Sequence, residues 1–88
     1  MDRDIRLKRL KFRSHHRGTR EADMMIGGFF DAQGEGWNDE EIDWFESFLE
    51  EQDVDIMAWA LCAQPVPENW QGSMMTAFQR LDFIAPAD

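Results

Sequence analysis

Residues 19–30 read TREADMMIGGFF, and this stretch carries the clearest helical pattern of the chain. Its apolar side chains recur at the spacing i, i+3, i+4, i+7 and i+8, which places them on one face of a helix. They are Ala22, Met25, Ile26, Phe29 and Phe30. Thr19 is suited to cap this helix, and Glu21 and Asp23 follow in the first turn, where the helix dipole favours negative charge. We interpret the Gly27-Gly28 pair as a point of close helix–helix packing.

The rest of the chain follows helical spacing too, and we find no strand alternation. We predict further helices over residues 3–15, from 38 to about 52, from 53 or 55 to about 64, and from about 68 to 83. Asn38 and Glu41 form a capping-box pattern at the start of the third helix. The fold class is therefore all-α: one compact domain of about five short helices over residues 1–88, with loose termini at 1–5 and 84–88.

Two of these helices carry further expectations. In the first, Ile5 and Phe12 fall on one side and Leu7 and Leu10 on the other, so one side can meet the core and the other a partner. The fourth helix is apolar nearly all round, which places it in the centre of the bundle. Cys62, at its end, is expected to be a small buried hydrophobic residue.

The charge of the chain is divided unevenly. The 88 residues carry a net charge of −9, and 43% are hydrophobic, which excludes a disordered acidic tail and argues against binding to nucleic acid or an anionic membrane. Residues 1–20 hold eight basic and two acidic residues, a net +6, whereas residues 21–88 hold sixteen acidic residues and one basic, a net −15. A basic head therefore precedes an acidic body.

We expect a cytoplasmic protein, because a lone cysteine fits a reducing compartment and neither a membrane span nor a secretory signal is visible. We also expect a protein that is not an enzyme. The adjacent His15 and His16 point in different directions on a helix, no serine or cysteine has an evident triad, and no phosphate loop is present. Residues 31–36 resemble the start of a calcium loop, but the required twelfth position is Ile42, so no metal site is predicted.

The charge changes sign at residues 16–23, HRGTREAD. A helix–turn–helix junction accounts for Gly18, Thr19 and Glu21, but it does not require Arg17 and Arg20 beside them. Guanidinium and carboxylate groups around one turn can offer charge-assisted hydrogen bonds in both directions. The pattern indicates a protein interface.

At these residues the chain resembles the succinate dehydrogenase flavinylation factors, the small bacterial SdhE-type proteins and their mitochondrial counterparts. RGTRE at 17–21 fits the family motif Arg-Gly-x-x-Glu, and DVDIMAW at 53–59 is similar to its Asp-x-Asp-Leu-x-x-Trp segment. The resemblance covers about residues 6–81. His16 stands where many members carry a second arginine, and Ala22 replaces a larger apolar residue.

The resemblance implies a helical assembly factor that binds the flavoprotein subunit of succinate dehydrogenase, and often that of fumarate reductase, and promotes covalent attachment of FAD to it. The factor would have no cofactor of its own. The implied partner-binding residues are Arg17, Gly18 and Glu21, with Arg20, Asp23 and His16 as neighbours. A general helical adaptor or inhibitor, whose basic head binds an acidic protein or nucleic acid, is the alternative. We expect a monomer, and the aromatic content would allow a weak dimer.

Overall fold

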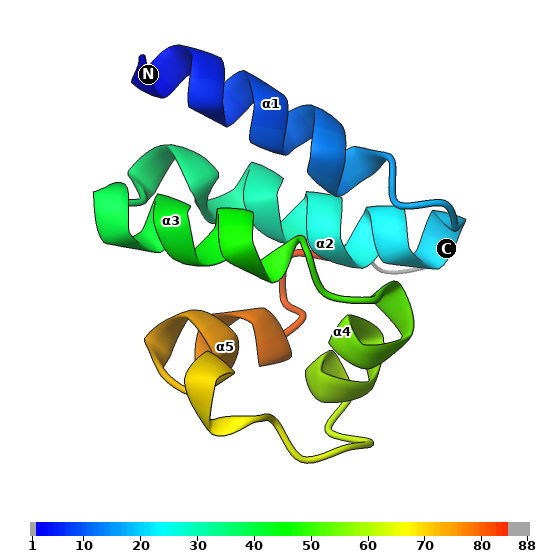
Figure 1. Cartoon of the computed structure of the whole chain (residues 1–88). Helices are drawn as coiled ribbons and strands as arrows, with labels where there is room; N and C mark the ends of the chain where they lie inside the picture. The colour runs from blue at the N-terminus through cyan, green and yellow to red at the C-terminus, as the bar shows by residue number, and fades with distance from the viewer. Residues whose placement is uncertain (1, 85–88) are drawn as a thin grey trace.

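Helix α2 (Arg20–Gln33) is the element around which the others pack. The computed structural model describes residues 2–84, and within them it contains five α-helices, two 3-10 turns and no strand, which confirms the all-α prediction. The other elements are α1 (Arg3–His15), η1 (Gly34–Gly36), α3 (Asp39–Phe48), α4 (Asp53–Ala60), η2 (Glu68–Trp70) and α5 (Ser73–Gln79). Helix α1 lies along one side of α2 and α3, and α4 and α5 lie on the other side (Figure 1).

The core is built on the apolar stripe of α2. All five predicted stripe residues are buried, and they meet buried side chains of α1, α3, α4 and α5. The ring of Phe29 lies at its centre, 5.1 Å from the ring of Phe78, 5.5 Å from that of Trp37 and 6.1 Å from that of Phe45. Tilted aromatic pairs at such distances add specific contacts to the burial of apolar area, so this cluster fixes how the helices pack.

The predicted helix caps are present. The hydroxyl of Thr19 accepts a hydrogen bond from the Ala22 amide at 3.2 Å. Asn38 and Glu41 form a complete capping box, in which each side chain accepts a hydrogen bond from the backbone amide of the other residue. These bonds satisfy amide groups that a helix start leaves without partners, so both helices begin where the sequence indicates.

Helix α1 confirms the prediction of a helix over residues 3–15, so residues 3–5 of the segment predicted to be loose are helical, and Met1 lies outside the described residues. The helix begins at Arg3, and the Asp2 side chain accepts the Asp4 amide at its start. At the other end, Ile84 is half-buried against the core. The remaining residues of the predicted loose segment, 85–88, lie outside the described residues.

The position predicted for α4 is wrong, because α2 and not α4 occupies the centre. Helix α4 buries Ile56, Trp59 and Ala60, whereas Val54 is 73% exposed and Leu61, just after the helix, is 59% exposed. Cys62 is exposed too, so the expectation that it is buried is wrong, and its φ of 58° lies in the left-handed region just after the helix ends. An apolar residue therefore does not always mark a buried position, since much of a protein surface is apolar.

The last predicted helix is interrupted. Instead of one helix over about 68–83, the chain forms η2, then an extended step, then α5 from Ser73 to Gln79. Gly72 has a φ of +143°, a conformation that no helical residue adopts and that glycine reaches easily. The periodicity of Trp70, Met74 and Phe78 is thus shared between two elements rather than carried by one.

Gly27 confirms the interpretation of close helix–helix packing, whereas Gly28 packs closely against a segment that is not helical. A Cβ atom on Gly27 would lie 2.6 Å from Nδ1 of His15, at the end of α1. A Cβ atom on Gly28 would lie 3.2 Å from the ring of Phe83. The two glycines therefore allow the end of α1 and the C-terminal segment to approach α2 from two directions.

Candidate functional site

The turn between α1 and α2 carries the residues singled out by the charge pattern. Gly18 lies at its tip with a φ of +116°, where a residue with a side chain is strained. A Cβ atom added there would meet nothing within 4 Å, so the backbone of Gly18 faces open space. The turn thus presents bare backbone at the surface of the protein.

Arg17 is used by the fold itself. Its side chain is only 12% exposed and reaches across to the segment between α3 and α4. Nε donates to Asp53 Oδ1 at 2.8 Å, Nη1 to the Leu49 carbonyl at 2.8 Å and Nη2 to the Glu51 carbonyl at 3.1 Å. The end of a helix leaves carbonyls without partners, and Arg17 satisfies them at the end of α3. The expectation that the fold does not require Arg17 is therefore wrong.

Asp23 holds the same turn from the α2 side. Its carboxylate accepts a hydrogen bond from the backbone amide of Arg17 at 2.5 Å and is half-buried. His16 is fixed as well, because its Nδ1 lies 2.7 Å from the Phe12 carbonyl and its ring stacks on that of Phe12 at 4.1 Å. Three of the six predicted site residues therefore help to shape the turn.

Arg20 and Glu21 are different. Both are exposed in the first turn of α2, and within residues 2–84 neither side chain makes a hydrogen bond or an ion pair. They are one positive and one negative group beside the open backbone of Gly18. Such groups can form charge-assisted hydrogen bonds with a partner without first breaking bonds inside the chain.

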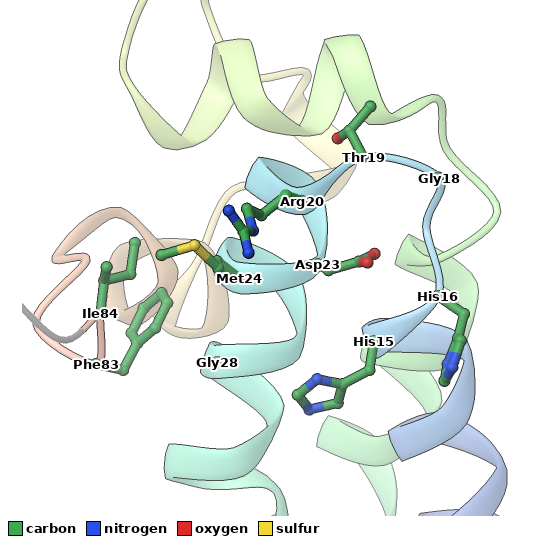
Figure 2. Close-up of a pocket in the computed structure, with 10 residues that line it drawn as sticks. All are labelled: His15, His16, Gly18, Thr19, Arg20, Asp23, Met24, Gly28, Phe83 and Ile84. Atoms are coloured by element: carbon green, nitrogen blue, oxygen red, sulfur yellow. The ribbon is translucent and has the colours of Figure 1, made fainter.

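An open groove with a volume of about 770 Å³ adjoins the turn (Figure 2). Four predicted residues line it, namely His16, Gly18, Arg20 and Asp23, whereas Arg17 and Glu21 do not. The other lining residues are His15, Thr19, Met24, Gly28, Phe83 and Ile84. Figure 2 shows Phe83 and Ile84 on the opposite side of the groove from His15 and His16, with Met24 and Gly28 between them. The groove therefore has a polar wall and an apolar wall.

The apolar wall is the part of the site that sequence reasoning missed. Met24 lies outside the buried stripe of α2 and is half exposed. An apolar residue outside the stripe and next to the charge switch is the sequence signal that could have identified this wall. Phe83 and Ile84 come from the end of the described chain, and no spacing rule connects them with residues 16–23.

The basic head is partly neutralised by the acidic body. Arg6 lies 2.7 Å from Asp43 and 3.6 Å from Glu46, and Arg13 lies 2.7 Å from Glu50, so one flank of α1 is paired with α3 and the segment just after it. The hydrogen bond to Asp43 raises the pKa of the Arg6 guanidinium above its ordinary value, with smaller contributions from nearby carboxylates. The charge asymmetry of the sequence is thus in part an internal contact of the fold.

The fold and the groove define a small all-α protein with an open surface groove beside the turn between α1 and α2. No group of three or more histidine, cysteine or acidic side chains within residues 2–84 is placed to hold a metal ion. None of the helices described there combines the length and the apolar character of a membrane span.

The chain belongs to the family described as flavinator of succinate dehydrogenase, whose family model matches residues 8–82. It is 43% identical over 64 residues to the FAD assembly factor SdhE of Acetobacter pasteurianus, which covers 73% of this chain and 59% of that protein. It is 33% identical over 75 residues to the mitochondrial succinate dehydrogenase assembly factor 2 of Mycosarcoma maydis, covering 85% of this chain and 32% of the other. A fungal relative in Saccharomyces cerevisiae S288c, also a mitochondrial succinate dehydrogenase assembly factor 2, is 33% identical over 82% of this chain and 46% of its own length.

These comparisons confirm the family resemblance drawn from residues 17–21 and 53–59. The matched segments span about a third to three fifths of the lengths of these relatives.

Proposed function

We propose that this chain is an assembly factor that binds the flavoprotein subunit of succinate dehydrogenase and promotes covalent attachment of FAD to a histidine of that subunit. Family membership supports the proposal, as does the similarity to an FAD assembly factor and to succinate dehydrogenase assembly factors. The single observation that carries the binding surface is the exposed backbone of Gly18 beside the charges of Arg20 and Glu21, which form no ion pair within residues 2–84. The flavoprotein subunit of fumarate reductase is a second proposed partner.

Some residues of the turn hold its structure, and others contact the partner. Arg17 and Asp23 hold the turn in place through hydrogen bonds inside the chain. Gly18 lets a partner backbone approach closely, and Arg20 and Glu21 provide charge-assisted hydrogen bonds to it. His16 and the groove receive side chains of the partner next to these contacts. The binding surface is thus preorganised, which reduces the entropy that is lost when the partner docks.

The chemistry of attachment belongs to the partner and its flavin. The factor docks on the flavoprotein and holds its domains so that the acceptor histidine and the flavin are aligned. Holding two reacting groups in a productive geometry lowers the barrier without any catalytic group from the factor. The lone cysteine, Cys62, is compatible with a reducing compartment such as the cytoplasm, where we propose that this assembly takes place.

The test is co-expression of the flavoprotein subunit with variants of this chain, followed by a denaturing gel in which protein-bound flavin is read by its fluorescence. We expect Glu21→Ala and Gly18→Arg to reduce the fluorescence strongly. Glu40→Ala is the matched control, because Glu40 is exposed at the same position of α3 that Glu21 occupies in α2. It should leave the fluorescence unchanged.

Two outcomes would contradict the proposal at different levels. Full flavin attachment in cells that lack the factor altogether would overturn the function. A strict requirement for the factor, combined with full activity of Glu21→Ala and Gly18→Arg, would keep the function but overturn this surface.

A further inference from the structure

Helix α1 has an outer face that the fold leaves uncovered. Phe12 is 65% exposed and Ile5 is 47% exposed, whereas Leu10 on the opposite side is completely buried. This confirms the two-sided pattern expected from the sequence. A hollow of about 310 Å³ lies on the exposed side, lined by Lys8, Lys11, Phe12, His15 and His16. We refer to Lys8, Lys11, Phe12 and His16 as the outer α1 face.

The positive charges of the outer α1 face can pair with carboxylates of a partner, whereas those of the flank that packs on α3 already pair with carboxylates of this chain. Arg6 and Arg13 on that flank are paired with carboxylates of α3 and the segment after it. Lys8 and Lys11 are exposed, and within the described part of the chain their side chains make no hydrogen bond or ion pair. Helix α1 therefore carries two sets of basic residues: one pairs with acidic residues of this chain, and the other pairs with none of those between residues 2 and 84.

The aromatic part of the outer face is held in place. The His16 ring stacks on Phe12 with an angle of 18° between their planes, and its Nδ1 lies 2.7 Å from the Phe12 carbonyl. An exposed aromatic side chain that is already ordered loses little conformational freedom on binding. Aromatic residues of this kind often provide much of the affinity of a protein interface.

The outer face is also continuous with the groove beside Gly18. His15 and His16 line both the hollow on α1 and the groove. A partner that covers the turn therefore meets Phe12 and Lys11 without crossing any other element.

We propose that the outer α1 face is a second part of the docking surface for the flavoprotein, and that it takes an acidic segment of the flavoprotein that also carries an apolar side chain. The inference rests on the proposed function. The apolar side chain packs on Phe12, and carboxylates beside it pair with Lys8 and Lys11. A short acidic segment suits two lysines, whereas an extended polyanion would also meet the net charge of −15 carried by residues 21–88.

The test measures the dissociation constant for the purified flavoprotein subunit by titration calorimetry at low and at moderate salt. We expect Lys8→Glu and Lys11→Glu each to raise it by about fivefold at low salt and to reduce its salt dependence. Phe12→Ser is expected to raise it by about tenfold. Because Phe12 is exposed, this variant should keep the far-ultraviolet circular dichroism of the parent chain.

Matched controls come from the other side of the molecule. Arg80→Glu makes the same charge change at an exposed residue that lines neither hollow, and Val54→Ser removes an equally exposed apolar side chain from α4. Both should change the dissociation constant by less than about twofold.

The failure of this inference can be told apart from the failure of the proposed function. If Glu21→Ala weakens binding and the three variants of the outer face do not, the function stands and the inference is overturned. The inference is also overturned if these variants leave flavoprotein binding intact but weaken binding to phosphatidylglycerol vesicles or to duplex DNA. The inference is likewise overturned if the only effect of these variants is to abolish a dimer detected by light scattering, because the outer α1 face would then bind a second copy of this chain.

Discussion

Arg17 and Asp53 form an ion pair at 2.8 Å that joins the turn between α1 and α2 to the start of α4. The two residues lie 36 positions apart in the sequence and are both largely shielded from water. The same guanidinium also donates to two backbone carbonyls that follow the end of α3. Together these bonds hold the turn in a fixed position against the segment between α3 and α4. The geometry of the proposed binding surface therefore depends on the ion pair between Arg17 and Asp53, which is itself largely shielded from solvent.

Replacing Arg17 should destabilise the fold. We expect Arg17→Ala to lower the free energy of unfolding by about 2 kcal/mol, because it leaves the Asp53 carboxylate and two carbonyls without their donor. Urea unfolding followed by circular dichroism measures this change. Arg20→Ala is the control and should change the value by less than about 0.5 kcal/mol, since Arg20 is exposed. Equal unfolding midpoints for the two variants would contradict the structural role of Arg17.

Gly27→Ala should show that α1 and α2 are in contact at this position. The new Cβ atom would lie 2.6 Å from the His15 ring, so we expect a loss of about 1–2 kcal/mol in stability. Gly36→Ala is the control, because a Cβ atom at Gly36 meets nothing within 4 Å. Thermal unfolding of both variants makes the comparison.

The same contact predicts a coupling between two substitutions. When His15→Ala has already removed the ring, Gly27→Ala should cost less than it does in the parent chain. Strictly additive effects of the two substitutions would argue against direct packing.

Gly18→Ala should also be destabilising, but for a different reason. The added methyl group would meet no neighbour, yet the φ of +116° strains any residue that has a side chain. We expect a loss of about 1 kcal/mol in the free energy of unfolding, measured in urea. A neutral or stabilising effect would mean that the turn can adopt another conformation at no cost.

Met24→Ser should weaken partner binding without weakening the fold. Met24 is half exposed in the apolar wall of the groove, so little core packing is lost when it is replaced. We expect the dissociation constant for the flavoprotein subunit to rise by about fivefold, as for an apolar contact in an interface. Titration calorimetry provides the value, with Val54→Ser as the comparison. An unchanged constant would remove the groove from the proposed binding surface.

The features that the sequence predicts well are those that depend on neighbours within a few residues. The buried face of α2, the bounds of α1 and the capping box at Asn38 follow from helical periodicity and from side chains that bond backbone amides three residues away. The charge switch at residues 16–23 and the motif within it are also features of neighbouring residues, and they lie inside the stretch 8–82 that the family model matches.

By itself, the sequence determined a helical protein, the helix faces that carry apolar residues, and the family to which the chain belongs. Only the tertiary structure decided that Arg17 is held by Asp53, that Phe83 and Ile84 form a wall of the groove, and that Leu61 and Cys62 point to solvent. Each of these depends on how helices distant in sequence pack together. The apolar pattern of one helix indicates which face can be buried, but the contacts available in the assembled core decide which face is covered.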